Sequence, residues 1–246
     1  MNVSLFQAAA AMNTNARWQE LISENLSGSS IPGYKKQDLS FAAVQAGQSP
    51  AGVSGTQGVT LPKAVAVTNF RQGEIKSTGV NTDVALEGPG FLSVQLPDGN
   101  IGYTRDGELH VNSTGQLVTK QGLLVMGDGG PIQLDPSNSS PLSISATGEV
   151  SQGSDSKGKL QISDFSQPHL LTPISHGCFI PGDPSMRAED APGTTVRQGF
   201  VEVANTSSSS EMVNLIAAMR MYEANQRVVQ MHDERMGKAI SELGNS

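Results

Sequence analysis

Residues 208–243 read SSSEMVNLIAAMRMYEANQRVVQMHDERMGKAISEL, and this stretch decides the fold. It contains no proline, and Ser208 followed by Glu211 has the form of a capping box, in which the two side chains satisfy backbone N–H groups of a first helical turn. We predict a single helix over the whole stretch, roughly 50 Å long at the usual helical rise. The alternative is a core helix that breaks at Gly237.

Apolar residues form a stripe along this predicted helix. Steps of three and four residues from Met212 reach ten positions, of which eight are apolar, as in the a and d rows of a coiled coil. The stripe predicts a seam for a partner helix, in which the polar Gln226 and Asp233 would fix the register. The ten positions are Met212, Leu215, Met219, Tyr222, Gln226, Val229, Asp233, Met236, Ile240 and Leu243.

The N-terminal segment is a candidate partner helix. Residues 2–26 contain no proline, and apolar residues recur there at helical spacing, namely Leu5, Ala8, Met12, Ala16, Ile22 and Leu26. The segment lacks the basic start, apolar run and cleavage site of a secretory signal. Neither end carries the roughly eighteen apolar residues of a membrane span. We therefore expect no cleaved signal peptide and no direct membrane insertion.

The middle of the chain predicts β-structure. Between Thr82 and Val203, short alternating or apolar runs are separated by turn sequences such as Asp-Gly and Asn-Ser-Thr-Gly. The predicted strands are 83–87, 91–96, 101–104, 108–111, 116–119, 123–126, 131–134, 142–145, 159–165 and 195–203. Residues 45–58 have neither periodicity nor bulky side chains, so we predict a flexible loop there.

Together these elements predict an α+β chain with a mainly-β central domain and long N- and C-terminal helices that pair as a coiled coil. We divide the chain into four segments. These are an N-terminal assembly helix and turn (1–34), a linker or extended segment (35–81), a β-rich domain (82–206) and a C-terminal assembly helix (207–246).

Composition and motif spacing argue against several functional classes. The net charge of -7 does not suit a nucleic-acid backbone or an anionic membrane, and a single cysteine excludes an internal disulfide. Gly153–Lys159 has the outline of a phosphate loop, but Leu160 stands where a hydroxyl should bind magnesium, so we predict a hairpin turn. His176 and Cys178 lack the further ligands of a zinc site. We predict no catalysis, no cofactor and no metal.

Six motifs, in this order, resemble those of the flagellar rod and hook protein family. They are NLSGSSIPGYK at 25–35, FRQG at 70–73, DVALEGPGF at 83–91, YTRDG at 103–107, QGFVEVAN at 198–205, and the EMVNLI, R, YE and N positions of 211–225. The resemblance spans nearly the whole chain. It departs from the family pattern at Ser27, Gly28 and Met219, and in the serine run that precedes the last motif.

The resemblance implies a structural subunit of the bacterial flagellar basal-body rod. Such subunits self-assemble into a helical tube that transmits torque from motor to hook, with terminal helices forming the inner tube and the β domain the outer wall. The short length and the stretch 129–132 favour the proximal-rod protein, with the distal-rod protein as the alternative. A secreted β-domain binding module is a more distant alternative.

The resemblance also implies partners and a location. The partners are homologous rod and hook-family subunits, further copies of the chain itself and the flagellar type III export apparatus, while nucleic acid is not a partner. The location is the rod that spans the periplasm. The stripe and the matched motifs predict an assembly interface at Leu5, Met12, Ile22, Asn25, Leu26, Gly33, Tyr34, Met212, Leu215, Met219, Arg220, Tyr222, Asn225, Gln226, Val229, Met236 and Ile240.

Overall fold

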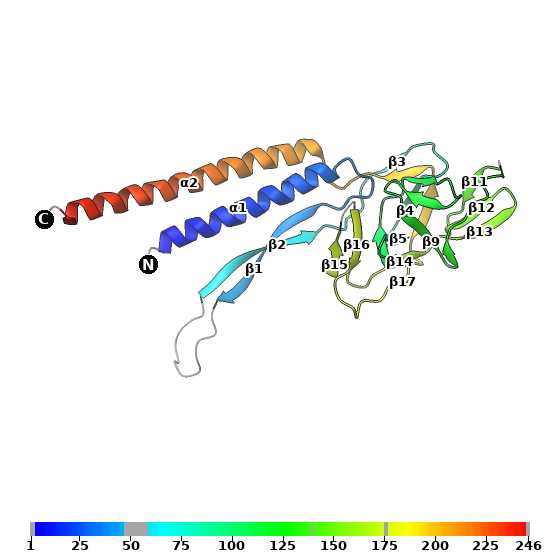
Figure 1. Ribbon diagram of the computed structural model, residues 1–246, viewed down its shortest axis with the longest axis horizontal. Coiled ribbons are helices and arrows are strands. Elements are labelled where there is room, and N and C mark those ends of the chain that lie inside the picture. Colours follow the sequence, from blue (N-terminus) through cyan, green and yellow to red (C-terminus); the bar gives the residue numbers. More distant parts are fainter. Residues whose placement is uncertain (1–2, 47–58, 139, 175–176, 245–246) are drawn as a thin grey trace. The chain divides into compact units, whose positions relative to one another are not determined.

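The computed structural model describes residues 3–46, 59–138, 140–174 and 177–244 (Figure 1). It is mainly β, with one long helix near each end, as predicted. The chain forms two compact units. Unit 1 comprises Met1–Leu26, Gln37–Val67 and Ser208–Ser246, and unit 2 comprises Ser27–Lys36 and Thr68–Ser207. Unit 2 is therefore inserted twice into the sequence of unit 1.

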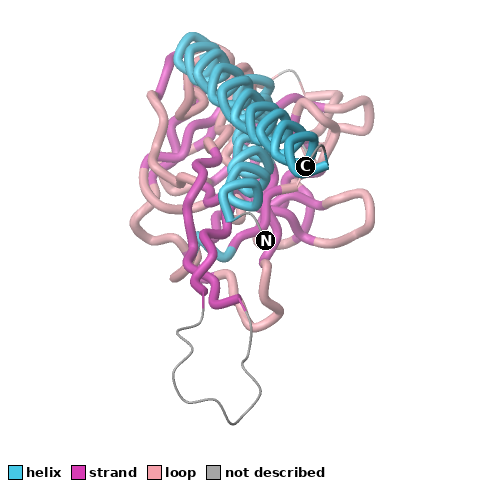
Figure 2. Tube along the Cα trace, turned by 90° about the vertical axis from the view of Figure 1, so that its left-hand side faces the viewer, coloured by secondary structure: helices cyan, strands magenta, loops and turns pink. Residues whose placement is uncertain are grey.

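The two long helices belong to unit 1 and are drawn in cyan in Figure 2. α1 covers Val3–Gly28, of which the last two residues belong to unit 2, and α2 covers Ser208–Gly244. α2 continues through Gly237, so the alternative of a helix broken there is wrong. α1 ends at Gly28, where a Cβ atom would collide with the ring of Tyr34.

The rest of unit 1 is a two-stranded sheet of β1 (Gln37–Ala46) and β2 (Val59–Thr68). These strands, together with β3 (Ile75–Ser77) of unit 2, lie in the segment 35–81 that we predicted to be a linker or extended segment. Of the predicted flexible loop 45–58, residues 45 and 46 belong to β1, and residues 47–58 lie outside the described residues. The four-part division of the chain stays a prediction.

A ten-stranded sheet forms the centre of unit 2. Its main path runs β15-β16-β6-β5-β9-β8-β7, with β10 beside β9, and with β14 between β5 and β17. Neighbouring strands are antiparallel. The strands are β5 (Phe91–Gln95), β6 (Ile101–Thr104), β7 (Leu109–Val111), β8 (Leu117–Thr119), β9 (Leu124–Gly127), β10 (Gly130–Pro131), β14 (Ile162–Asp164), β15 (Leu171–Pro173), β16 (Cys178–Pro181) and β17 (Glu189–Asp190).

Smaller sheets complete unit 2. β11 (Leu142–Ile144), β12 (Glu149–Gln152) and β13 (Asp155–Lys159) form one of three strands. β4 (Val84–Glu87) pairs with β18 (Thr195–Gln198), and β3 pairs with β19 (Phe200–Glu202). A 3-10 turn, Pro168–Leu170, precedes β15.

The predicted strands are found with three differences. The run 159–165 is divided between Lys159, the last residue of β13, and β14. The run 195–203 is split into β18 and β19 at Gly199, whose φ of 78° interrupts the extended backbone. The run 131–134 contributes only Pro131 to a strand. The Gly153–Lys159 segment is a hairpin, as predicted, with Gly153 at φ 66° in the turn between β12 and β13.

Unit 2 has an apolar core and a separate aromatic cluster. The apolar core includes Val94, Leu117, Val125 and Val150, none of which is measurably exposed. The aromatic cluster contains Phe70, Phe91, Tyr103, Phe165 and Phe179. Four of the seven phenylalanines of the chain therefore gather in one place, which concentrates a small aromatic content where it buries the most surface.

Phe91→Ala should destabilise unit 2 by about 3 kcal/mol, because the ring is 3% exposed and its loss leaves a cavity among three other phenylalanine rings. Denaturant unfolding of the purified chain measures the effect. The control is Val111→Ala in β7, whose side chain is 39% exposed, and which should shift stability by no more than about 0.5 kcal/mol. Equal effects of the two substitutions would contradict this account of the core.

Candidate functional site

A fully buried carboxylate, that of Glu202 at the end of β19, lies at the centre of a charged cluster in unit 2. Lys35 Nζ lies 2.5 Å from its Oε1, and Arg105 Nη1 lies 3.3 Å from its Oε2. The backbone N–H of Gly73 also donates to Oε1, at 2.7 Å. Both carboxylate oxygens are therefore partnered, which a buried charge requires.

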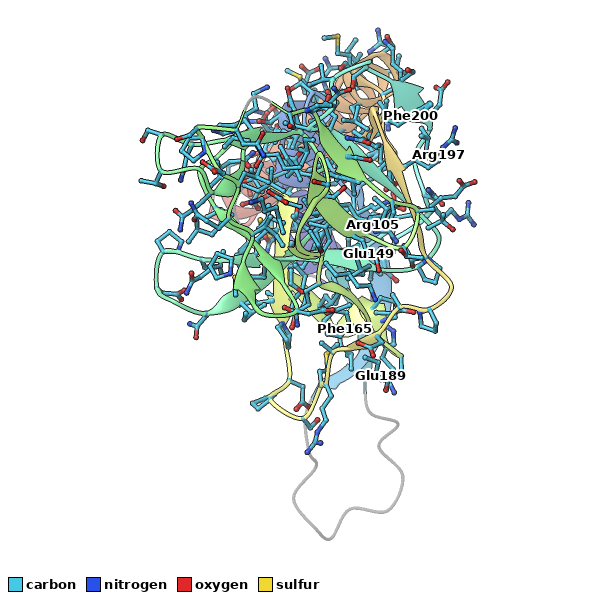
Figure 3. All side chains as sticks on the ribbon, turned by 90° about the vertical axis from the view of Figure 1, so that its right-hand side faces the viewer. Arg105, Glu149, Phe165, Glu189, Arg197 and Phe200 are labelled. Carbon is cyan, nitrogen blue, oxygen red and sulfur yellow. The ribbon has the colours of Figure 1, made fainter. Side chains whose placement is uncertain are left out.

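Arg105 extends the cluster toward the aromatic residues. Its Nη2 donates to Gly88 O at 2.6 Å, and its guanidinium carbon lies 5.1 Å from the centre of the Phe91 ring. Figure 3 places Arg105 among the strands, whereas Arg197 and Glu189 lie toward the edge of the view. Among the described residues, Arg105 Nε is a buried side-chain donor without a hydrogen-bond partner. Its positive charge is stabilised by Glu202 and by the ring face.

Burial acts on the two cations in the same direction. Removal from water lowers the pKa of Lys35 and the pKa of Arg105, because it disfavours their charged forms, and the charge of Glu202 opposes both shifts. The cluster therefore depends on Glu202, since it is the carboxylate that contacts both cations.

Lys35 is held in place by the chain around it. Its Nζ also donates to Arg71 O at 3.0 Å. Gly33, two residues earlier, has a φ of 69°, and a Cβ atom there would collide with the backbone of Arg105. The N–H of Gly33 donates to Glu202 O at 2.7 Å. Glycine is required at this position because of both its backbone conformation and this close approach.

Asn205 joins three segments next to the cluster. Its Oδ1 accepts from the N–H of Lys36 at 2.7 Å. Its Nδ2 donates to Asn69 O at 2.7 Å and to Arg71 O at 3.0 Å. Its own N–H donates to Tyr34 O at 3.3 Å. One amide side chain thus connects residues that are far apart in the sequence.

The side chain of Gln72 connects the motif at 70–73 with the motif at 83–91. Its side chain donates to Leu86 O at 2.8 Å and accepts from the N–H of Gly88 at 3.4 Å. Five of the six motifs singled out in the sequence therefore meet around Glu202. The sequence marked each motif but did not predict that they contact one another. One signal in the sequence could have pointed to the cluster. Lys35, Arg105 and Glu202 are charged residues that each lie within a motif of predicted strand or turn residues.

The predicted interface residues near the end of α1 make contacts within the chain. Asn25 is 1% exposed, and its side chain both accepts from the N–H of Gln37 and donates to Gln37 O, at 2.9 Å each. Ile22 is buried, while Met12 and Leu26 are half-buried. The side chain of Leu5 lies outside the described part of the structure. Whether these residues also contact other subunits stays a prediction.

The least exposed stripe of α2 differs from the predicted one in one row. Leu215, Tyr222 and Val229 are half-buried, in agreement with the predicted d row. The other row of the stripe is Glu211, Ala218, Asn225 and His232, each one residue before the predicted position. Met212, Met219, Gln226, Asp233 and Met236 are exposed, as is Arg220, and the side chain of Ile240 is not described.

In the single subunit the second row of the stripe therefore lies one residue before the predicted a row, whose part in the assembly stays a prediction. A helix of 3.6 residues per turn drifts against a strict seven-residue repeat, so a stripe counted on apolar character alone can be displaced by one position. Ala218, fully buried, allows closer packing than Met219 would, and Glu211, 1% exposed, is stabilised by polar contacts such as the one from Asn214.

The outer face of α2 is unusually apolar as a result. Eight large apolar side chains on this helix are between 37% and 67% exposed, namely Met212, Val213, Ile216, Met219, Met221, Val228, Met231 and Met236. Met236 continues the row of Leu215, Tyr222 and Val229, and the other seven lie on the outer face. Large exposed apolar surfaces of this kind mark interaction sites.

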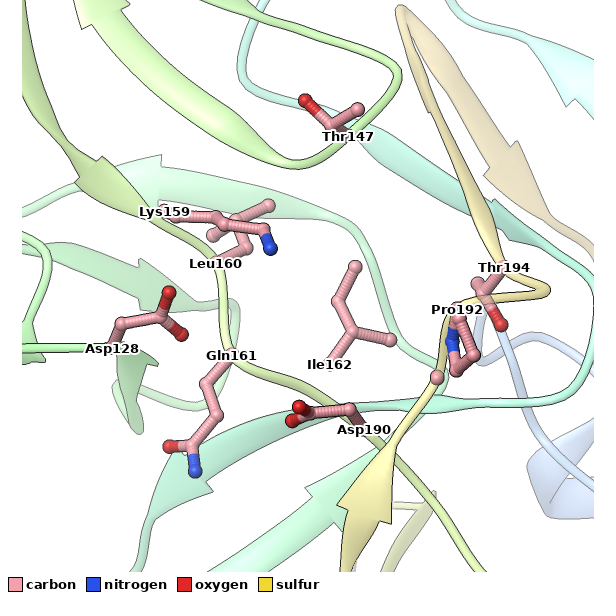
Figure 4. Close-up of a pocket in the computed structure, with 10 residues that line it drawn as sticks. Asp128, Thr147, Lys159, Leu160, Gln161, Ile162, Asp190, Pro192 and Thr194 are labelled. Atoms are coloured by element: carbon pink, nitrogen blue, oxygen red, sulfur yellow. The ribbon is translucent and has the colours of Figure 1, made fainter.

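Figure 4 shows a pocket of unit 2 with a volume of about 390 Å³. Asp128, Lys159 and Asp190 are among the residues that line it, and within the described residues no side-chain hydrogen bond connects these three. The described residues also contain no cluster of three or more potential metal ligands.

Of the pair His176 and Cys178, only Cys178 lies within the described residues. Cys178 is buried, and burial raises the pKa of its thiol to about 11, so it is a poor nucleophile at neutral pH. His176 lies outside the described residues. No helix in the described ranges is long and apolar enough to cross a membrane.

Glu202→Gln should destabilise unit 2 by about 3 kcal/mol, because it leaves two buried cations without a counter-charge. Lys35→Met alone should also be destabilising. The double variant should cost clearly less than the sum of the two single variants, since the residues act as one network. Denaturant unfolding of all three variants measures the coupling, and strict additivity would show that the ion pair does not act as a unit.

Comparison with known proteins gives matches over most of the chain. Residues 85–152 match the flagellar hook protein FlgE/F/G D1 domain, and residues 197–242 match the flagellar basal body rod FlgEFG protein C-terminal domain. The chain is 33% identical to the flagellar basal-body rod protein FlgG of Borreliella burgdorferi over 267 positions, which cover 96% of this chain and 97% of the relative.

Two further relatives show the same relationship. The FlgG protein of Buchnera aphidicola subsp. Baizongia pistaciae is 30% identical over 96% of this chain and 97% of its own length. The FlgF rod protein of Caulobacter vibrioides is 29% identical over 247 positions, which cover 99% of each chain. Identity at this level over nearly the full length, together with the two matched domains, shows that the chain belongs to the FlgF/FlgG type of flagellar basal-body rod proteins.

Proposed function

We propose that the chain self-assembles into a helical tube within the rod and transmits torque from the motor to the hook. The observation that carries this proposal is the apolar outer face of α2, where seven large side chains are exposed in the single chain. A contact between different surfaces of identical or similar subunits repeats without closing and produces a helical filament. Burial of the exposed side chains supplies the driving force for that contact.

In this proposal α1 and α2 pair as a coiled coil. Both helices belong to unit 1, and α2 places Leu215, Tyr222 and Val229 on a stripe with heptad spacing. The side chains on the opposite face of α2 then remain available to neighbouring subunits. The neighbours are homologous rod and hook-family subunits and further copies of this chain, as family membership suggests.

The family also supports a location and a route. The subunit would lie in the part of the rod that spans the periplasm and would arrive there through the flagellar type III export apparatus without cleavage of a signal peptide. The relatives are basal-body rod proteins by name, which supports the location. Catalysis is not part of the proposal, in keeping with relatives that are rod proteins by name.

Within the rod we favour the proximal position. The observations that favour it are the short chain of 246 residues and the stretch 129–132. The aligned lengths do not separate the two kinds of relative, since FlgF proteins align over 247 and 271 positions and the FlgG protein of B. burgdorferi over 267. The distal rod is the alternative. A secreted binding module is not favoured.

Leu215→Asp should abolish incorporation into the rod and hence swimming. Leu215 lies on the least exposed stripe of α2, and an unpaired carboxylate in the coiled coil costs several kcal/mol in each of many repeated contacts. The change lies in unit 1, so the unfolding transition of unit 2 should stay within about 0.5 kcal/mol of wild type. A motility assay and denaturant unfolding measure the two effects.

The matched control is Leu170→Asp, which places the same carboxylate on an exposed leucine of unit 2, outside the two long helices. It should leave swimming unchanged, because it removes none of the contacts proposed for α2. A swimming Leu215→Asp strain would overturn the proposed assembly role of α2.

A further inference from the structure

The chain passes between its two units at four points. These points lie between residues 26 and 27, 36 and 37, 67 and 68, and 207 and 208. Any force that the covalent chain carries from the terminal helices into the β-rich unit must therefore enter unit 2 near one of these points. Three stretches of unit 2 receive it, namely 27–36, 68–74 and 200–207.

These three stretches are bonded to one another. Lys35 reaches both Glu202 and Arg71 O, and Gly73 N–H donates to Glu202. The main chain adds Asn69 N–H to Lys36 O at 2.8 Å and Val203 N–H to Glu74 O at 2.8 Å. These hydrogen bonds thus connect the three stretches through which the covalent chain can transmit force into unit 2.

Asn205 lies in the third stretch, 200–207, and its side chain contacts the other two. Its side chain binds Lys36 N–H, Asn69 O and Arg71 O. Lys36 and Asn69 are the first and second residues inside unit 2 at their respective crossings. Force applied to the chain at Lys36 or Asn69 therefore acts on the hydrogen bonds of the Asn205 side chain before it acts on the sheets of unit 2.

We propose that Asn205, together with the Glu202 cluster, is a positioning joint that keeps the chain ends of unit 2 together when force passes between the helices and the β-rich unit. The inference rests on the proposed torque-transmitting function and assigns that function to particular residues. In a subunit without the joint, the ends separate one at a time under load, because each is then held by fewer bonds.

Asn205→Ala is the direct test, because it removes three side-chain hydrogen bonds without leaving a buried charge. Gln198→Ala is a matched control. Gln198 is also a half-buried amide with three bonds in unit 2, from Ile144 N–H at 3.1 Å and to Asn81 O and Leu142 O at 2.7 and 2.9 Å. Its bonds connect β18 with β11 and with residue 81, and none reaches a crossing point.

The first measurement is hydrogen exchange on the purified full-length chain. Asn205→Ala should speed exchange of the Lys36 and Asn69 amides about tenfold or more, while amides of β5, β6 and β9 keep wild-type rates. Gln198→Ala should leave the Lys36 and Asn69 amides at wild-type rates. Unchanged exchange at Lys36 and Asn69 in Asn205→Ala would overturn the joint.

The second measurement is swimming of complemented deletion strains in media of increasing viscosity. The Asn205→Ala strain should swim like wild type in dilute medium and lose speed as viscosity rises, whereas the Gln198→Ala strain should follow wild type throughout. Asn205→Asp, which is isosteric but sets a carboxylate oxygen against two carbonyls, should show the same sensitivity to viscosity. If both alanine strains respond alike, or if neither responds, the joint is refuted.

The same strains separate this inference from the proposed function. A deletion strain that swims without the chain refutes the rod function itself. A deletion strain that is immotile and is rescued by wild type upholds that function, whatever the Asn205 variants do under load.

Discussion

A single buried carboxylate, that of Glu202, organises the β-rich unit. A charge without access to water must be matched at short range, and here the matching groups come from Lys35, 167 residues earlier, and from Arg105, 97 residues earlier. The cluster therefore cannot form until nearly the whole chain has folded. It forms only when the segment after α1, the motif at 103–107 and strand β19 are all in their folded positions.

The charged cluster and the aromatic cluster support each other through Arg105. Its guanidinium lies over Phe91, and Phe91 packs against Phe70, Phe165 and Phe179. The rings exclude water from one side of the cation, which strengthens its attraction to Glu202. In return, the cation covers the face of a ring at the edge of the aromatic cluster. In this way the few aromatic residues of the chain stabilise both the aromatic cluster and the charged cluster.

Periodicity predicted both helices and most strands, because each buries one face and so imposes a pattern on the sequence. It missed β12, which has a single apolar residue, β13, whose residues are mostly exposed and none of them apolar, and β15 to β17, which are short and flanked by loops. In the single subunit the more buried row of α2 contains Ala218 and not Met219, a difference of one position that depends on how closely helices pack. The meeting of Lys35, Arg105 and Glu202 was beyond reach, since contacts across such separations leave no local pattern.

The bond between Asn205 and Asn69 has a consequence for the evolution of the fold. The two residues stand at the beginning and the end of the longer inserted stretch, 68–207, and the side chain of one meets the carbonyl of the other at 2.7 Å. An insertion whose ends adjoin can be exchanged, shortened or enlarged without moving its host. The stretch 68–207 of unit 2 is in this sense an exchangeable insertion, whose size can change without a change in the two long helices.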